Sequence, residues 1–492
     1  MTIELQVGTL LAFPLVAALL YATLGWRRST SWLGAASAIA MLGLSIAIGV
    51  EVTDSGGRTF ADGLIRVDAL SAFMLVVIAA VSVLATVAAP AHLGTEIDAG
   101  RLTNRAAARC GGLVQLFIVT MAAAVLAANL GVLWVAIEAT TIVTAFLVGQ
   151  RRTRAAVEAA WKYVVICSTG IALALLGIVV LNFAASHASS GPVGLDLVAL
   201  TTSADGLDPD TTRIAVVLLI IGFGTKAGLA PMHAWLPDAH SQAPGPVSAL
   251  MSGVLLSVAV YAILRVKAIA DGALGADFAR SLLAVMALAS LMVAAALLLA
   301  QRDYKRMLAY SSIEHMGLVT LGAAIGSPIA ASALLLHILG HGLVKGVLFI
   351  GAGRVLQITG TSRIDGVRGL LGRHPLVGGC VGFGVLALIG LPPSSLFASE
   401  LGIARAGLDS ELAWVTMAVF ILVLVIAAAL VRHAAGMMIG NPAEGAETLA
   451  KAPMGTSVVL VGGLVACAAL GLAAEPLVHL LDAAADTITG TR

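Results

Sequence analysis

The sequence predicts an all-α polytopic membrane protein with about fourteen transmembrane helices. Hydrophobic residues make up 59% of the 492 residues and charged residues only 11%, and the mean hydropathy is +1.01, far above that of soluble proteins. Glycine is abundant, with 53 residues, as is usual where helices pack closely in lipid. Apolar runs long enough to cross a bilayer recur along the whole chain.

The fourteen expected spans divide into four parts of the chain. Residues 1–110 hold helices 1–3, residues 111–265 a first five-helix repeat, residues 266–432 a second repeat, and residues 433–492 helix 14 and a short amphipathic tail. The first run begins after Glu4 without a basic segment before it, so we expect a retained span and not a signal peptide. The spans are expected near 8–25, 31–50, 67–90, 111–128, 130–149, 161–184, 213–232, 243–265, 280–300, 308–326, 328–356, 376–400, 413–432 and 455–474.

Composition also excludes several classes of function. The four cysteines are isolated and form no CxxC pair, so we expect no disulfide framework, metal site or iron–sulfur site. No dinucleotide-binding or P-loop motif occurs, which predicts a chain without a cofactor of its own. A net charge of +1 argues against a nucleic-acid partner.

The distribution of Lys and Arg sets the expected orientation. With the N-terminus outside, the inner loops and helix ends hold 18 basic residues, including Lys305 of the QRDYKR loop, and the outer segments hold 8. Cytoplasmic loops carry the excess of Lys and Arg, so we expect an inner (cytoplasmic) cell membrane with both termini on the outer side. At the outer end of helix 3, Arg66 and Asp68 can form an ion pair, and we expect this pair to have a structural role.

Helix 5 carries Glu138 near its midpoint, with no charged neighbour in sequence. One interpretation is a neutral carboxyl that is hydrogen-bonded by Thr140 or Thr141. The other is a proton site or a modulator of the nearest intramembrane cation, Lys226, because a neighbouring carboxylate favours the charged form of an amine. Glu158, in the loop before helix 6, is expected to be solvated.

The stretch 222–265 is the most unusual part of the chain. Lys226 lies inside an apolar run, where a cation costs about 2.5–3.5 kcal/mol on insertion scales. The helix-breaking residues Gly228 and Pro231 follow it, and then a polar segment with His233, Asp238 and His240. Membranes tolerate such breaks where they line a polar path. The polar segment therefore has three interpretations: helix capping, proton uptake from the inner side, or a metal site, which would need further ligands.

Helices 10 and 11 carry a second group of titratable residues. Helix 10 has Glu314 and His315, and helix 11 has His337, His341 and Lys345 at intervals of four. Each step of four rotates a side chain by only about 40°, so the last three form one stripe on a helix face. We interpret the stripe as part of a hydrated proton path, and not as packing.

Helix 12 is expected to break as helix 7 does. Gly390-Leu-Pro-Pro393 repeats the pattern of Gly228-Leu-Ala-Pro231 five spans later, and an odd offset reverses the direction of crossing. This spacing predicts two inverted five-helix repeats, helices 4–8 and 9–13, each with one broken helix. Glu400, after the second break, is either the exit of the path or a solvated carboxylate at the outer interface.

Several of these segments resemble a known family. KAGLAPMHAWLPDAHSQAPGPVSAL, QRDYKRMLAYSSIEHMG, HILGHGLVKGVLF and LPPSSLFASE are similar to the antiporter-like membrane subunits of respiratory complex I, Mrp antiporters and membrane-bound hydrogenases, from about Phe60 to Arg432. SSIEHMG and AWKYVVICSTGIAL most resemble the large membrane subunit of hydrogenase-4 and formate hydrogenlyase complexes. The resemblance implies fourteen helices with inverted repeats.

The resemblance also implies which residues relay protons. The family's positions fall on Glu138, Lys226, His315, His337, His341, Lys345 and Glu400. Many complex I relatives have a lysine in helix 8 where this chain has Ser257, four residues before Tyr261. A serine holds no charge at neutral pH, so the middle of the relay must use water or a histidine.

These features predict a proton-translocating subunit of a redox-driven oxidoreductase complex. Expected partners are other membrane subunits and a peripheral redox arm. One alternative is an Mrp-type subunit that exchanges Na⁺ for H⁺, although Lys and His cannot coordinate Na⁺. A non-pumping scaffold or a bicarbonate-uptake partner is another, which the costly intramembrane charges disfavour.

Overall fold

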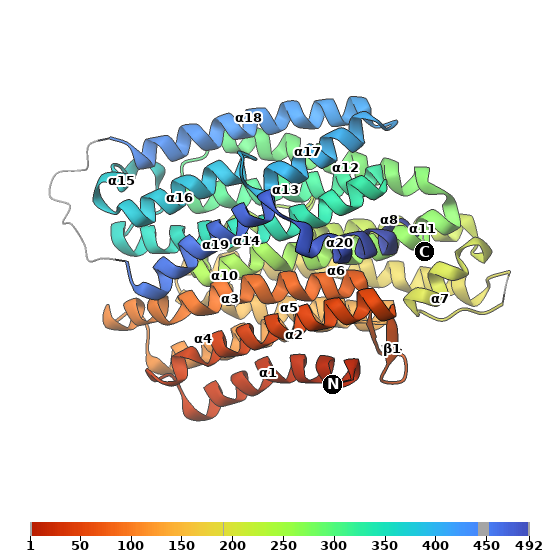
Figure 1. Ribbon diagram of the computed structural model, residues 1–492, viewed down its shortest axis with the longest axis horizontal. Coiled ribbons are helices and arrows are strands. Elements are labelled where there is room, and N and C mark those ends of the chain that lie inside the picture. Colours follow the sequence, from red (N-terminus) through yellow and green to blue (C-terminus); the bar gives the residue numbers. More distant parts are fainter. Residues whose placement is uncertain (1, 190, 441–451, 491–492) are drawn as a thin grey trace.

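The protein is a bundle of long helices that lie nearly side by side (Figure 1). The computed structural model describes residues 2–189, 191–440 and 452–490. The helices are α1 (Ile3–Leu24), α2 (Leu33–Ser55), α3 (Ala69–Asp98), α4 (Asn104–Val125), α5 (Leu130–Val148), α6 (Arg154–Ser186), α7 (Leu197–Thr202), α8 (Pro209–Ala227), α9 (Trp235–Gln242), α10 (Gly245–Leu250), α11 (Leu256–Leu274), α12 (Ala276–Leu299), α13 (Tyr304–Ile325), α14 (Pro328–Thr359), α15 (Leu370–Arg373), α16 (Pro375–Leu388), α17 (Ser395–Leu408), α18 (Ala413–Met438), α19 (Met454–Leu472) and α20 (Glu475–Thr489).

Short elements connect these helices. A π-turn, η4 (Met251–Leu255), joins α10 to α11, and the 3-10 turns are η1 (Thr30–Trp32), η2 (Gly149–Arg151), η3 (Ala204–Gly206) and η5 (Ile364–Gly366). An antiparallel hairpin of β1 (Arg58–Phe60) and β2 (Ile65–Val67) precedes α3. The all-α prediction included no strand here, because strands of three residues are too short for alternation to reveal them.

Within the described residues, eleven helical stretches are long and apolar enough to cross a membrane. This confirms a polytopic helical membrane protein. Two further helices, α8 and α13, are 19 and 22 residues long and carry buried charged side chains. The pair α16 and α17 contributes 14 residues each. The count of fourteen spans and the inverted repeats stay predictions.

The most buried helices lie in the centre of the bundle. Every residue in the most apolar window of the continuous α10–η4–α11 stretch is buried, and α14 is nearly as enclosed. By contrast, α1, α6 and α18 present large apolar side chains on the outside, among them Leu19, Phe183 and Leu424. Such a surface suits contact with lipid tails. Polar groups find no hydrogen-bond partners there, so the polar residues lie in the centre of the bundle.

Both expected helix breaks are helix ends in the structure. α8 ends at Ala227; Gly228, which follows it, has a φ of +76°, and a Cβ there would lie 2.4 Å from Leu236 Cδ1. α16 ends at Leu388, and Gly390 has φ +69°. The single span expected at 376–400 is therefore two helices. Ser394 caps the start of the second by accepting from Phe397 N at 3.2 Å, and that helix continues to Leu408.

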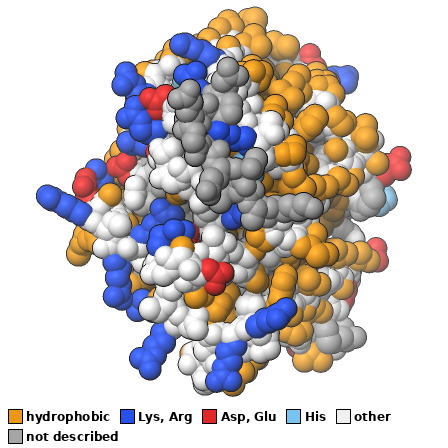
Figure 2. Space-filling model, turned by 90° about the vertical axis from the view of Figure 1, so that its left-hand side faces the viewer, with side chains coloured by type: hydrophobic (Ala, Val, Ile, Leu, Met, Phe, Trp, Pro, Cys, Tyr) orange, Lys and Arg blue, Asp and Glu red, His pale blue; other side chains and the backbone are white. Residues whose placement is uncertain are grey.

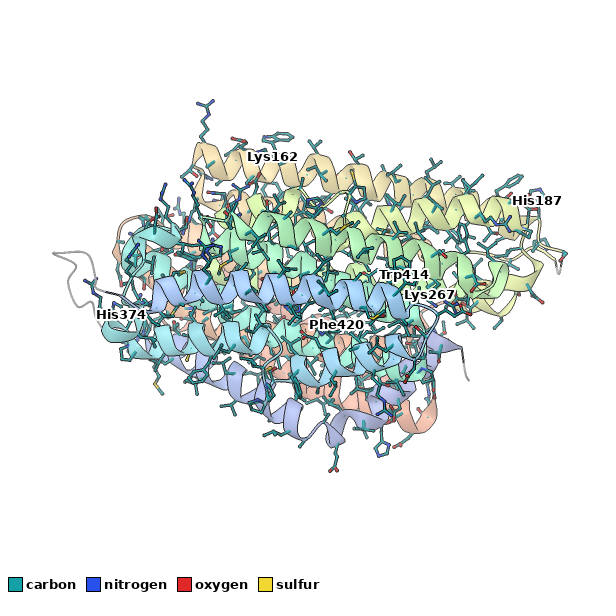
Figure 3. The ribbon with its side chains drawn as sticks, turned by 90° about the horizontal axis from the view of Figure 1, so that it is seen from above. Lys162, His187, Lys267, His374, Trp414 and Phe420 are labelled. Atoms are coloured by element: carbon teal, nitrogen blue, oxygen red, sulfur yellow. The ribbon has the colours of Figure 1, made fainter. Side chains whose placement is uncertain are left out.

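The two ends of the bundle differ in charge. Figure 2 shows Lys and Arg gathered over one end, which includes the exposed Arg27, Arg28, Arg105 and Arg152; we call it the arginine-rich end. His374 lies at this end and His187 at the opposite one (Figure 3). Lys451 and Arg492, which enter the charge count, lie outside the described residues.

One expectation about helix limits changes, and the expected amphipathic tail is a helix as far as the structure describes it. α6 begins at Arg154, so Glu158 lies in its first turns and not in a loop, where it accepts from Lys162 Nζ at 2.8 Å. The tail forms the amphipathic helix α20, which buries Leu480, Leu481 and Ile488 against α3 and α14.

Candidate functional site

Lys226 lies in the last turn of α8 and is fully buried. Its Nζ donates to Thr141 Oγ1 at 2.8 Å and to the Tyr163 hydroxyl at 2.6 Å. Thr141 donates in turn to Glu138 Oε2 at 3.2 Å, and Ser168 donates to Glu138 Oε1 at 3.2 Å. Glu138 and Lys226 form no direct ion pair among the described residues. The Thr141 hydroxyl links them, because it accepts from the ammonium and donates to the carboxylate.

Close packing of α6 against α8 creates this cluster. A Cβ at Gly170 would lie 2.4 Å from Thr225 Cβ, and one at Gly222 would lie 2.6 Å from Ala174 N. The glycines therefore bring Tyr163 and Ser168 of α6 within reach. At the end of α8, Trp235 Nε1 donates to Thr225 O at 2.9 Å, so a backbone group freed by the break is satisfied.

The polar segment after the break contains one surface group and one deeply buried group. Asp238 pairs with Lys162 at 3.2 Å and with Arg306 at 2.8 Å, so its carboxylate ties α9 to α6 and α13. His233 is half-buried. His240 is fully buried and stacks on Phe349 with 4.9 Å between ring centroids. Within the described chain, neither ring nitrogen of His240 has a hydrogen-bond partner.

Lys305 is buried, so the prediction that it is one of the ordinary inner charges is wrong. Its side chain is 1% exposed. Nζ donates to Ser241 O at 2.8 Å and to Ala243 O at 2.7 Å, at the C-terminal end of α9, where helix carbonyls favour a cation. Lys305 is buried because α9 folds back onto α13. No local sequence pattern predicts that contact.

The expected stripe on α14 faces the interior. His337, His341 and Lys345 are all fully buried. Lys345 Nζ donates to Leu308 O at 2.7 Å and to Ser311 Oγ at 2.5 Å. Like Lys226, this ammonium is held by neutral oxygens, within electrostatic reach of the buried Glu314.

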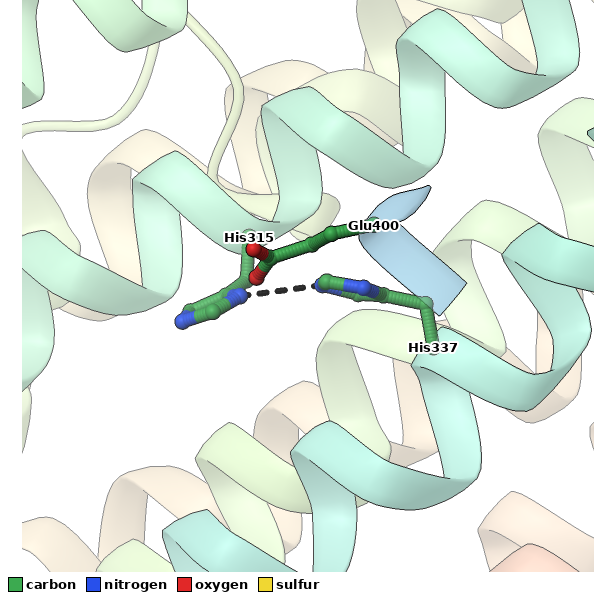
Figure 4. Close-up of side chains that lie close together, drawn as sticks. All are labelled: His315, His337 and Glu400. Atoms are coloured by element: carbon green, nitrogen blue, oxygen red, sulfur yellow. Dashed lines mark hydrogen bonds between the residues drawn. The ribbon is translucent and has the colours of Figure 1, made fainter. Parts of the chain in front are cut away.

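His315 brings α13 into contact with the stripe. Its Nδ1 lies 2.9 Å from His337 Nε2 (Figure 4), and its ring centroid lies 5.1 Å from that of His341. His337 Nδ1 lies 2.9 Å from Ser399 Oγ. One proton can move along this line of alternating donors and acceptors.

Glu400 completes this cluster from α17. Its side chain is 9% exposed, so a solvated interface carboxylate is wrong. Ligating atoms of His315, His337 and Glu400 lie within 4.8 Å of one another, a donor set that can bind a proton or a metal ion. A Cβ at Gly390 would lie 2.3 Å from Glu400 Oε2, so the carboxylate folds back over the second break.

The α10–α11 stretch packs against both α8 and α14 and carries hydroxyls. Ser257 is fully buried, and its hydroxyl has no partner among the residues that the structure describes. Ser252 Oγ lies 2.7 Å from Ser312 Oγ. A buried hydroxyl without a protein partner is satisfied by water, which suits the interpretation that water replaces a charged group here.

At the opposite end, a buried ion pair ties α3 to α11. Arg66 Nε lies 3.4 Å from Asp68 Oδ2, as expected, but Arg265 Nη2 lies only 2.7 Å from both Asp68 oxygens. Burial alone would raise the pKa of the Asp68 carboxyl, but the Arg265 guanidinium holds that pKa well below its usual value. This pair is a structural anchor, and sequence alone does not show that Arg265 is its main partner.

Comparison with known proteins places the chain in a family. Residues 127–426 match the family described as "NADH:quinone oxidoreductase/Mrp antiporter, TM". The chain is 35% identical over 398 residues to the hydrogenase-4 component F homolog of Methylacidiphilum infernorum, covering 80% of this chain and 82% of that protein. It is 36% identical over 274 residues to NADH-quinone oxidoreductase subunit N of Desulforudis audaxviator, covering 54% and 52%.

A solved structure supports the same assignment. A chain of the membrane-bound sulfane sulfur reductase, an archaeal respiratory membrane complex, aligns over 98% of this chain with a TM-score of 0.86 and 25% identity. The sequence match, the shared fold and the buried Lys, His and Glu residues agree. The chain therefore belongs to the family of NADH:quinone oxidoreductase/Mrp antiporter membrane subunits.

Proposed function

We propose that this chain is the proton-translocating subunit of a redox-driven membrane complex of the hydrogenase-4 or NADH-quinone oxidoreductase type. One observation carries the proposal: fully buried lysines and histidines on α8, α13 and α14 line up with two carboxylates, Glu138 and Glu400. Each such group is costly in a membrane interior and marks an ion or proton path. The chain would hold no redox centre and would work with other membrane subunits and a peripheral redox arm.

In the proposed path, a proton enters at the arginine-rich end near His233 and His240. It passes between Lys226 and the Lys345 stripe, by way of water near Ser257. It then crosses His341, His315 and His337 and leaves by Glu400. Glu138 acts on Lys226 through Thr141 and sets how firmly that ammonium keeps its proton.

The proposed orientation follows from charge. The arginine-rich end would face the cytoplasm, which places both termini on the outer side of the inner membrane. The eleven apolar spans, α8, α13 and the α16–α17 pair would make the fourteen crossings, with the broken helices α8 and α16–α17 as corresponding members of two inverted repeats.

The test is proton translocation by the intact complex in inverted membrane vesicles, followed with a pH-sensitive dye. Lys226→Ala and Glu138→Gln should abolish it while the complex still assembles, as judged by copurification of its subunits. Arg28→Ala is the control, because Arg28 is an exposed cation of the arginine-rich end, and it should leave translocation unchanged. Unchanged pumping in both site variants would refute the proposal.

An Mrp-type Na⁺/H⁺ antiporter subunit is the second candidate, supported by the family match. The path offers Lys and His, which do not coordinate Na⁺, so protons are the favoured cargo. Translocation that requires Na⁺ in the same vesicles would reverse that choice.

A further inference from the structure

A cavity lies at the arginine-rich end, apart from the relay residues. It measures about 530 Å³ and is lined by residues from α3, the loop after α3, η2 and α14, among them His92, Glu96, Leu102, Arg151 and Gln357. Pro244, directly before α10, forms part of the same wall. The cavity therefore reaches the segment that carries His240 and the carbonyls that hold Lys305.

His92 is the buried titratable group in this wall. It is 9% exposed, and Gln357 Nε2 lies 3.2 Å from its Nδ1. Gln357 also donates to Glu96 Oε1 at 2.9 Å, and Arg101 Nε donates to Glu96 Oε2 at 2.8 Å. One amide thus holds an imidazole and a carboxylate side by side at the edge of a water-accessible space.

The charges around His92 connect this cavity with the relay. Glu96 on the same helix and Arg151 of η2 line the same cavity, and Arg354 of α14 and Lys305 of α13 lie near enough to His92 to interact with it electrostatically. Lys305 in turn interacts with His240. A positive charge gained at His92 therefore repels the charge on Lys305. This repulsion favours transfer of the Lys305 proton towards the interior of the bundle.

The steps from Lys305 onward consist of neighbouring titratable groups. His240 lies within electrostatic reach of Lys345, and His341 within reach of both. The ring nitrogens of His240 and His341 have no protein partner in the described part of the chain. Buried imidazoles without protein partners require water, so these groups are suited to pass a proton through hydrogen-bonded water.

We propose that this cavity is the proton-uptake site of the subunit, with His92 and Glu96 as the first groups to take up a proton from the inner side and Lys305 as the link to His240. This deepens the proposed function and rests on it. The route begins on α3, which the relay does not otherwise use, and joins the proposed path at the segment that carries His240. His92 and Glu96 bind the proton, whereas Gln357 is a positioning residue.

The first test blocks the cavity from one side. In inverted vesicles that hold the intact complex, the inner face is exposed to the medium. A bulky, charged, membrane-impermeant thiosulfonate is added to a Leu102→Cys variant, because Leu102 lines the cavity and the four native cysteines are buried. We expect loss of most proton translocation, restored by a reducing agent. His374→Cys is the matched control, because His374 lies at the same end outside the cavity wall, and its modification should change nothing.

The second test removes the uptake group. His92→Leu should slow translocation by about tenfold or more at alkaline inner pH, and the rate should fall steeply as the inner pH rises, because protonation from the medium becomes limiting. His374→Leu should keep the profile of the unsubstituted protein. The proposed uptake site is wrong if the translocation rate of His92→Leu depends on inner pH as that of the unsubstituted protein does. It is also wrong if the reagent leaves the Leu102→Cys variant active.

Lys226→Ala separates the two proposals. If Lys226→Ala abolishes translocation while the His92 and Leu102 variants behave as the unsubstituted protein does, only the uptake site is wrong. If Lys226→Ala pumps normally, the proposed function itself fails.

Discussion

Thr141→Val tests the link between Glu138 and Lys226. Valine has nearly the shape of threonine, so the change removes one hydroxyl and little packing. The structure predicts the loss of two hydrogen bonds, from Lys226 Nζ at 2.8 Å and to Glu138 Oε2 at 3.2 Å, while Tyr163 keeps its bond to Lys226 at 2.6 Å. A hydrogen bond to a charged group is worth about 1.5–3 kcal/mol.

A loss of this size changes the equilibrium between protonated and neutral Lys226 by about tenfold or more, since about 1.4 kcal/mol corresponds to a factor of ten. We expect proton translocation in inverted vesicles to fall accordingly, with assembly unchanged. Thr140→Val is the control, because Thr140 is equally buried on the same helix and its hydroxyl donates to Ile137 O. If both variants pump equally well, Thr141 does not couple the two groups.

Two further predictions concern the opposite end and the second break. Asp68→Asn should lower the free energy of unfolding by about 3–5 kcal/mol, because it leaves Arg265 buried and unpaired. The melting temperature of the detergent-solubilised protein should fall accordingly. Asp210→Asn, at an exposed ion pair, should change that temperature little. Because the pKa of Asp68 is lowered in the folded protein, its contribution is present at neutral pH and is lost only as the pH falls below the usual range of an aspartate. Gly390→Ala should displace the Glu400 carboxylate and reduce proton translocation. Gly379→Ala, with no atom within 4 Å of the added Cβ, should have no effect. Normal translocation by Gly390→Ala would show that this position of Glu400 is not needed.

The features that the sequence predicts well are local ones. Length and hydropathy locate the apolar spans, because the bilayer fixes how long each must be. The helix ends at Gly228 and Gly390 were predictable, since glycine and proline act on their own backbone. The stripe of His337, His341 and Lys345 also follows from helical periodicity alone.

The features that the sequence misses are contacts between distant segments. Lys305 follows a pattern of ordinary loop charge, and only the return of α9 onto α13 buries it. Arg265 and Asp68 are 197 residues apart, so no local spacing joins them. The link from Glu138 to Lys226 needed Thr141 to face both groups, which depends on how α5 meets α8. Glu314 was grouped with the titratable residues of helices 10 and 11 but was given no role. His92 was not singled out, because only the fold brings it next to Gln357 of α14.

The lysines of the proposed relay have few carboxylates beside them, and this bears on how the relay would work. Lys226, Lys345 and Lys305 are held by hydroxyls and carbonyls, and His240 and His341 lie within electrostatic reach of Lys345. Two unit charges about 6 Å apart repel by about 3 kcal/mol at an effective dielectric constant of about 20. Neighbouring sites therefore disfavour being charged together, so in the proposed relay a proton that arrives at one site would promote release from the next. Carboxylates paired directly with the lysines would cancel this repulsion. Glu138, however, is one hydroxyl away from Lys226, and Glu314, within electrostatic reach of Lys345, forms no ion pair with it among the described residues.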